Sequence, residues 1–117
     1  METMDNKWHL VIVLAVSVCV HFFFYGTPDQ VVFDEVHFGS FVSSYHDQEY
    51  FFDIHPPLGK LLIAGFAQFF DFKTEYSFAE IGNEFPDKQY LVLRLLPTLA
   101  GTLFPVIIFL LLKELGL

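Results

Sequence analysis

Cysteine and basic residues are scarce in this chain of 117 residues. Cys19 is its single cysteine and lies inside an apolar run, which leaves no disulfide framework and no cysteine-based metal site. Lysine and arginine together number six against fourteen acids, for a formal net charge of -8. Because a nucleic-acid backbone is bound through lysine and arginine, this balance argues against a nucleic-acid partner.

Charged residues are missing from residues 8–25, which contain no Asp, Glu, Lys or Arg. A helix of this length just crosses a hydrocarbon core of roughly 30 Å. Trp8 and Tyr25 at its ends suit the aromatic belts of a bilayer. A signal peptide fits less well, because its apolar region would be too long and no A-x-A-like cleavage site follows. Hydrophobic residues reach 54% and aromatics 19%, which also indicates a membrane protein.

A second span is predicted over residues 90–112. Pro97 and Pro105 lie inside it, and a membrane helix tolerates proline when neighbouring helices satisfy the freed carbonyls. Gly101 permits close helix approach, so this span is expected to pack against helices that the chain itself does not supply. Arg94 costs at least about 2.5 kcal/mol at mid-membrane depth and less near the end of a span, so we expect it to have a partner. That partner is a phosphate, one of the carboxylates of Asp34 and Glu35, or a subunit interface, and the sequence leaves all of these open.

The segment between the spans, residues 26–89, is acidic. Eleven of the fourteen acids lie between Asp29 and Asp87, which is typical of a solvated loop or of an active-site loop on the aqueous side. Apolar spacing predicts short helices over about 35–46 and 57–70. The second has an apolar run that rises only about 15 Å, so it cannot span and is expected to lie at the membrane interface.

Two adjacent carboxylates, Asp34 and Glu35, open the first short helix. Read from the residues alone, Asp34 is an N-cap and Glu35 a first-turn acid favoured by the helix dipole, or the pair takes part in acid–base chemistry. His55 is a hydrogen-bonded structural residue or a ligand contact, and Lys60 either meets a phosphate or snorkels to the interface. A metal site is the competing chemistry, but no HExxH or similar spacing occurs among its candidate ligands, Asp34, Glu35, His37, Asp53 and His55.

Three stretches carry a resemblance to a known family. They are FDEVHFG at 33–39, FFDIHPPLGK at 51–60 and RLLPTLAG at 94–101. In order and spacing they resemble the start of the protein O-mannosyltransferases, glycosyltransferases of GT-C architecture. Ser40 stands where that family often has lysine, and Phe72-Lys73 replaces a glycine that usually follows Phe-Asp. These departures put the acceptor class in doubt more than the reaction.

The resemblance implies an all-α membrane protein in which two transmembrane helices bracket an outward loop with short interfacial helices. The chain is then expected to be the N-terminal fragment of a multi-span GT-C fold, truncated after residues 113–117. Residues 1–7 and 113–117 are expected in the cytoplasm, and the loop outside the cell or in the endoplasmic reticulum lumen. The short amino terminus favours a bacterial or archaeal plasma membrane, with the endoplasmic reticulum if the source is eukaryotic.

The implied reaction moves mannose, or a related hexose, from a polyprenyl or dolichyl phosphate to protein Ser/Thr hydroxyls with inversion. By resemblance, Asp34 is the general base, and Glu35 either supports Asp34 without touching the substrate or positions the acceptor. Substrate or phosphate binding is expected from Arg94, Lys60 and His55. No cofactor and no metal are expected, and a homologous subunit is an expected dimer partner.

A function of another class stays open. The chain could be a non-catalytic two-span membrane subunit, or a remnant, that pairs with a partner helix through Gly101. That reading predicts no effect of Asp34→Asn beyond helix stability.

Overall fold

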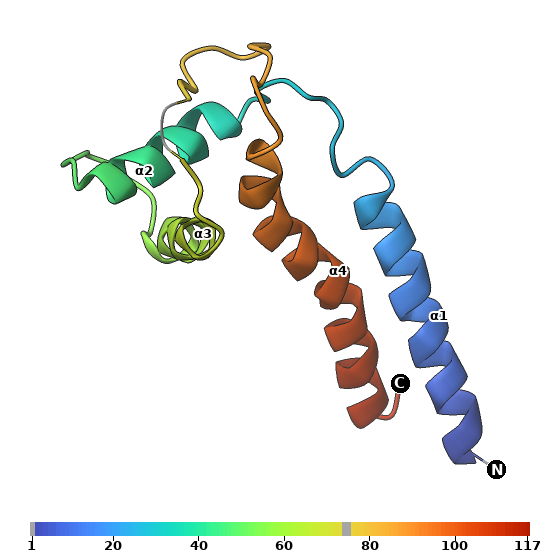
Figure 1. Ribbon diagram of the computed structural model, residues 1–117. Coiled ribbons are helices and arrows are strands. Elements are labelled where there is room, and N and C mark those ends of the chain that lie inside the picture. The colour runs from blue at the N-terminus through green and yellow to red at the C-terminus, as the bar shows by residue number, and fades with distance from the viewer. Residues whose placement is uncertain (1, 74–75) are drawn as a thin grey trace. The chain divides into compact units, whose positions relative to one another are not determined.

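The computed structural model describes residues 2–73 and 76–117, with side chains from residue 7 onward. Within these ranges the chain forms helices and no strand (Figure 1). The helices are α1 (Glu2–Phe22), α2 (Glu35–Asp47), α3 (Leu58–Phe69) and α4 (Tyr90–Glu114). The chain divides into two compact units, one of residues 2–25 with 97–117 and the other of Gly26–Leu96. The all-helical class predicted from the sequence is therefore confirmed.

One helix of the described residues is long and apolar enough to cross a membrane. This helix is α4, with 25 residues and a mean hydropathy of 2.3 in its most apolar part. The apolar part of α1, Lys7–Phe22, is too short for the same criterion. The first predicted span included residues up to Tyr25, but α1 ends at Phe22 and turns follow it. The second span therefore has support from length and composition, whereas the first stays a prediction.

In the first unit, small side chains form the seam between α1 and α4. The Ser17 hydroxyl is buried and donates a hydrogen bond to the carbonyl of Thr102, at 2.8 Å. A Cβ added to Gly101 would lie 2.8 Å from the His21 ring. Small residues at such a seam let helix backbones approach closely. The expectation that the chain supplies no helix for Gly101 is therefore wrong, because α1 packs there.

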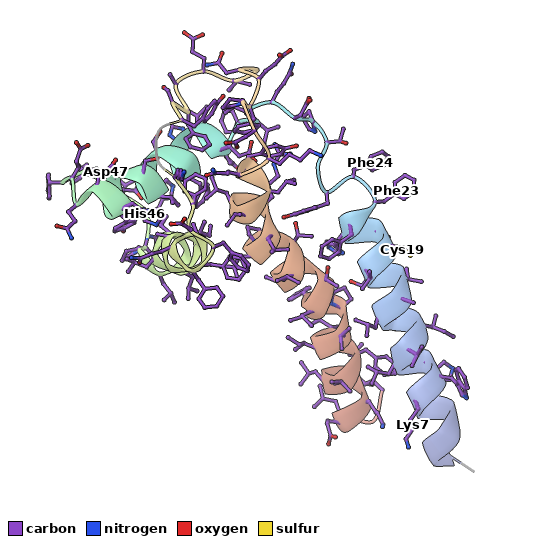
Figure 2. The ribbon with its side chains drawn as sticks, in the orientation of Figure 1. Lys7, Cys19, Phe23, Phe24, His46 and Asp47 are labelled. Atoms are coloured by element: carbon purple, nitrogen blue, oxygen red, sulfur yellow. The ribbon has the colours of Figure 1, made fainter. Side chains whose placement is uncertain are left out.

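Away from this seam, the first unit exposes apolar side chains. Phe23 and Phe24 follow α1 with 78% and 67% of their surface exposed (Figure 2), and Cys19 is exposed on α1 itself. On α4, the exposed side chains include Leu103, Phe104 and Ile107. An outer surface of this kind suits a hydrocarbon environment better than water.

In the second unit, α2 packs against α3 (Figure 1). Small or short side chains line the contact, with Val42 of α2 and Ala67 of α3 fully buried and Ala64 of α3 nearly so. The His46 ring, near the end of α2 (Figure 2), forms a 3.0 Å hydrogen bond with the carbonyl of Ala64. The remaining buried apolar residues of this core are Val31, Phe72, Phe78, Tyr90 and Leu93.

The two ends of the long loop are joined by backbone hydrogen bonds. Val31 donates to Asn83 at 2.9 Å, Gly82 donates to Val31 at 2.9 Å, and Phe85 donates to Asp29 at 3.1 Å. Gly82 has a φ of 88°, a conformation that a side chain disfavours. This pairing fixes the segment that leads into α2 against the segment that leads into α4.

Gly39 is the position where this core tolerates no side chain. An added Cβ would lie 2.3 Å from the Phe78 ring, which packs directly on the α2 backbone. We expect Gly39→Ala to lower the unfolding free energy by about 1–3 kcal/mol through overpacking. Thermal unfolding of the full-length protein in detergent measures this loss of stability.

Gly65 of α3 is the matched control, because a Cβ there meets nothing within 4 Å. Gly65→Ala should be neutral or stabilise the helix by about 0.5–1 kcal/mol. Equal unfolding temperatures for both variants would contradict the packing described for Gly39.

Candidate active site

The adjacent carboxylates lie where α2 begins. Asp34 occupies the N-cap position, and its carbonyl accepts hydrogen bonds from the amides of His37 and Phe38. Its side chain makes no capping hydrogen bond, so Asp34 is an N-cap by position only. Glu35 is the first residue of the helix, and its carboxylate reaches back to the amide of Val32 at 3.0 Å.

Arg94 of α4 binds the Glu35 carboxylate through two nitrogens. Arg94 Nε donates to Glu35 Oε1 at 2.5 Å, and Nη2 donates to Oε2 at 3.0 Å. Both side chains are largely buried, with 13% and 14% of their surface exposed. A bidentate pair of this kind fixes orientation as well as charge. The structure thus selects Glu35 among the partners that the sequence left open for Arg94.

Arg94 also holds the segment that precedes α2. Its Nη1 donates to the carbonyl of Pro28 at 2.6 Å, and its Nη2 donates to that of Gln30 at 3.1 Å. The guanidinium therefore links three points of the loop, two on the backbone and one on a side chain. Its predicted contact with a phosphate stays a prediction.

Asp34 contrasts with its neighbour. Its side chain is exposed, and among residues 2–73 and 76–117 it forms neither a hydrogen bond nor an ion pair. The Glu35 carboxylate is thus neutralised and fixed by Arg94, whereas the Asp34 carboxylate is open to solvent. An open carboxylate beside a fixed one can accept a proton from an incoming hydroxyl.

Tyr76 stands near this pair. Its hydroxyl donates to the carbonyls of Asn83 at 3.4 Å and Glu84 at 3.2 Å. Burial, and secondly the negative charge of Glu35, raise the pKa of Tyr76 above its usual 10.0. The phenol therefore remains neutral and a donor at physiological pH.

The other predicted residues gather around Asp53, in a second cluster. Lys60 is buried and forms an ion pair with Asp53 Oδ2, and its ammonium lies 4.6 Å from the centre of the Phe41 ring. His55 Nδ1 lies 2.9 Å from Asp53 Oδ1, but 73% of the His55 side chain is exposed. Lys60 therefore does not snorkel toward solvent, and His55 has the hydrogen bond expected of a structural residue.

An open cavity of about 550 Å³ adjoins this second cluster. Asp53, His55 and Lys60 line it together with the aromatic side chains of Tyr45 and Phe51. It offers a mixed polar and aromatic surface, of the kind that accommodates a polar ligand.

In the described part of the chain, no three His, Cys, Asp or Glu side chains gather where they could hold a metal ion. His37 stacks on Phe41 and His46 bonds to α3, so these histidines serve different neighbours. The absence of a metal requirement stays a prediction.

Several residues of the site were not predicted from the sequence. The sequence indicates Asp53 only as a candidate metal ligand, although Asp-x-His before Pro-Pro also signals the turn in which Asp53 accepts a hydrogen bond from the His55 amide at 3.1 Å. The carbonyls of Pro28 and Gln30 carry no sequence signal, because their direction depends on the pairing with residues 82–85. Tyr76 carries none either.

Comparison with known proteins agrees with the family motifs. The family profile described as dolichyl-phosphate-mannose-protein mannosyltransferase matches residues 11–117. The chain belongs to this family. Dolichyl-phosphate-mannose–protein mannosyltransferase 4 of Schizosaccharomyces pombe is 40% identical over 112 residues, 94% of this chain and 14% of the relative. Mannosyltransferase 1 of Saccharomyces cerevisiae is 35% identical over 117 residues, 99% of this chain and 14% of the relative.

A solved structure matches as well. The Saccharomyces cerevisiae protein O-mannosyltransferase Pmt1-Pmt2 complex bound to the sugar donor aligns with a TM-score of 0.81 at 38% identity. The alignment covers 88% of this chain and 14% of that one. The chain thus spans about one seventh of the length of its relatives. The relatives named here come from fungi, so the preference for a bacterial or archaeal source has no support from them.

Breaking the buried ion pair should cost stability. Lys60→Met leaves the Asp53 carboxylate, 8% exposed, without its cation, and we expect the unfolding free energy to fall by about 3–5 kcal/mol. Lys60→Met with Asp53→Asn should regain much of that loss, because the buried charge is removed as well. Thermal unfolding of the three proteins checks this, and a double variant less stable than Lys60→Met would contradict it.

Tyr76 gives a pH dependence. Since its pKa is higher in the folded than in the unfolded chain, its contribution to stability is full below pH 10.0 and declines as pH rises beyond that value. Tyr76→Phe should lower stability by about 1 kcal/mol near neutral pH and remove that alkaline component. Unfolding temperatures at about pH 8 and about pH 11 separate the two effects. Parallel alkaline losses in both proteins would refute the assignment to Tyr76.

Proposed function

We propose that the whole protein is an inverting glycosyltransferase that moves mannose from dolichyl phosphate mannose to Ser or Thr hydroxyls of proteins. Family membership supports the reaction class. The assignment of residues is carried by one difference between the two acids. Arg94 binds the Glu35 carboxylate, whereas the Asp34 carboxylate is open to solvent.

In this proposal, Asp34 takes the proton from the acceptor hydroxyl while that oxygen attacks the anomeric carbon. The new carbon–oxygen bond forms as the bond to the lipid phosphate breaks, and the phosphate leaves with the electron pair. General base catalysis of this kind contributes on the order of 10²–10⁴-fold to a rate. Glu35 positions the start of α2 rather than receiving the proton, because its oxygens already accept hydrogen bonds from Arg94 and Val32.

The departing phosphate needs positive charge or hydrogen-bond donors. Lys60 and His55 line the open cavity beside Asp53, and we propose them as contacts for the donor phosphate or for polar groups of the acceptor. His55 is the more accessible of the two. We expect transfer to continue in excess chelator, since the proposed chemistry uses no metal.

We further propose that both α1 and α4 span the endoplasmic reticulum membrane, with residues 26–89 in the lumen. α4 has the necessary length, and the apolar exposed surface of α1 suits lipid. The outer face of α3, with Leu58, Leu61 and Phe69 exposed, would lie at the interface. By analogy with the Pmt1-Pmt2 complex, a homologous subunit is the proposed partner.

Asp34→Asn in the full-length protein tests the base assignment. We expect kcat for transfer of labelled mannose to a Ser/Thr peptide to fall by about 10²–10⁴-fold with the fold intact. Asp71→Asn is the matched control: Asp71 is exposed and has a φ of 54°, a conformation that asparagine accepts readily. Undiminished transfer by Asp34→Asn would overturn the assignment of Asp34 as the base, whereas absence of transfer by the wild-type protein would favour a non-catalytic membrane subunit.

The topology is tested with a glycosylation acceptor in the loop. Tyr50 is 92% exposed, so Tyr50→Asn with Phe52→Thr creates an accessible Asn-x-Thr site. We expect a glycan at this site, detected as a mobility shift that a glycosidase removes, and none on the same acceptor in a tag placed before Met1. A glycan on the tag alone would reverse the proposed orientation.

A further inference from the structure

Arg94 lies beside a stacked pair of aromatic rings, Phe85 and Tyr90. Its guanidinium carbon lies 4.6 Å from the centre of the Tyr90 ring and 5.7 Å from that of Phe85. The two rings are parallel within 6°, with centres 4.3 Å apart. A guanidinium held near aromatic faces is attracted to their electrons and restricted in orientation.

This stack is itself fixed at both ends of the loop. The Tyr90 hydroxyl donates to the carbonyl of Gly26 at 2.9 Å, and Tyr90 is 6% exposed. The backbone amide of Phe85 donates to Asp29, and its ring contacts Tyr76 at 5.0 Å between centres. The positions of the two rings, and with them the position of the Arg94 guanidinium, therefore depend on how the ends of the loop are held.

The stack is not simply core filling. Two open cavities of about 310 and 550 Å³ adjoin it, and Phe85 and Tyr90 line both. Shortening Phe85 therefore enlarges space that is already open, which costs less stability than a new buried cavity. The larger effect of shortening Phe85 should be on the orientation of the Arg94 guanidinium.

We propose that Phe85 and Tyr90 are positioning residues for mannosyl transfer. Their stacked rings orient the Arg94 guanidinium, which fixes the Glu35 carboxylate and the start of α2, and thereby places Asp34 for its reaction. This inference rests on the proposed function for its kinetic consequence. Its structural consequence, a firmly held Glu35, does not depend on any activity.

The experiment compares Phe85→Leu with Phe85→Tyr, which keeps an aromatic ring, in the purified full-length enzyme. The control is Phe69→Leu, an identical change on α3 at a side chain that is 84% exposed. Initial rates with dolichyl phosphate mannose and a Ser/Thr peptide give kcat and KM. Hydrogen exchange of the peptide covering residues 30–36 reports the Val32 amide, which donates to Glu35.

We expect Phe85→Leu to lower kcat about 10-fold or more, since a displacement on the order of 1 Å can cost up to about 10²-fold. Both KM values should stay within about twofold, and exchange at residues 30–36 should accelerate. Phe85→Tyr and Phe69→Leu should stay near wild type in both measurements.

Unchanged exchange and unchanged kcat in Phe85→Leu would overturn the proposal, as would an equal loss in Phe85→Tyr, which keeps the ring. A kcat loss explained entirely by a smaller folded fraction would overturn it too. If the wild-type protein transfers no mannose, the proposed function fails, and the exchange measurement alone decides whether the rings hold Glu35.

Discussion

The bidentate ion pair between Arg94 and Glu35 is the interaction on which the rest of the loop depends. An arginine near the start of an apolar helix is costly unless it is paired, and removing one member of a buried pair leaves the other uncompensated. Here Arg94 donates two hydrogen bonds to the Glu35 carboxylate and two more to backbone carbonyls. One guanidinium therefore ties the start of α4 to the start of α2 and to the segment before it.

This constraint explains why neighbouring acids take different roles. Residues adjacent on a helix point in different directions, so one guanidinium cannot engage both side chains equally. Glu35 turns back toward Val32 and Arg94, whereas Asp34 is directed to solvent. The Lys60–Asp53 pair performs a comparable task beside the open cavity, where it joins the segment before α3 to α3 itself.

The sequence predicts the two short helices of the loop well, because their apolar spacing and the Pro56-Pro57 boundary are local signals, whereas α1 covers Glu2–Phe22 rather than residues 8–25. The helices expected over about 35–46 and 57–70 begin and end within one residue of α2 and α3. It does not predict Lys60 facing inward, since that depends on the burial of Ala64 and Ala67 against α2. Nor does it distinguish Glu35 from a phosphate as partner of Arg94, because such a choice depends on how distant segments fold together.

A double-mutant cycle on kcat tests the central claim most directly. The cycle compares Glu35→Gln, Arg94→Gln and the double variant in the full-length protein. If Arg94 acts through Glu35, the double variant loses no more than the worse single variant, on the order of 10²-fold where each single change costs that much. If the two losses in kcat multiply in the double variant, to on the order of 10⁴-fold, the result would contradict the account. It would point to a separate role of Arg94, such as direct contact with the donor phosphate.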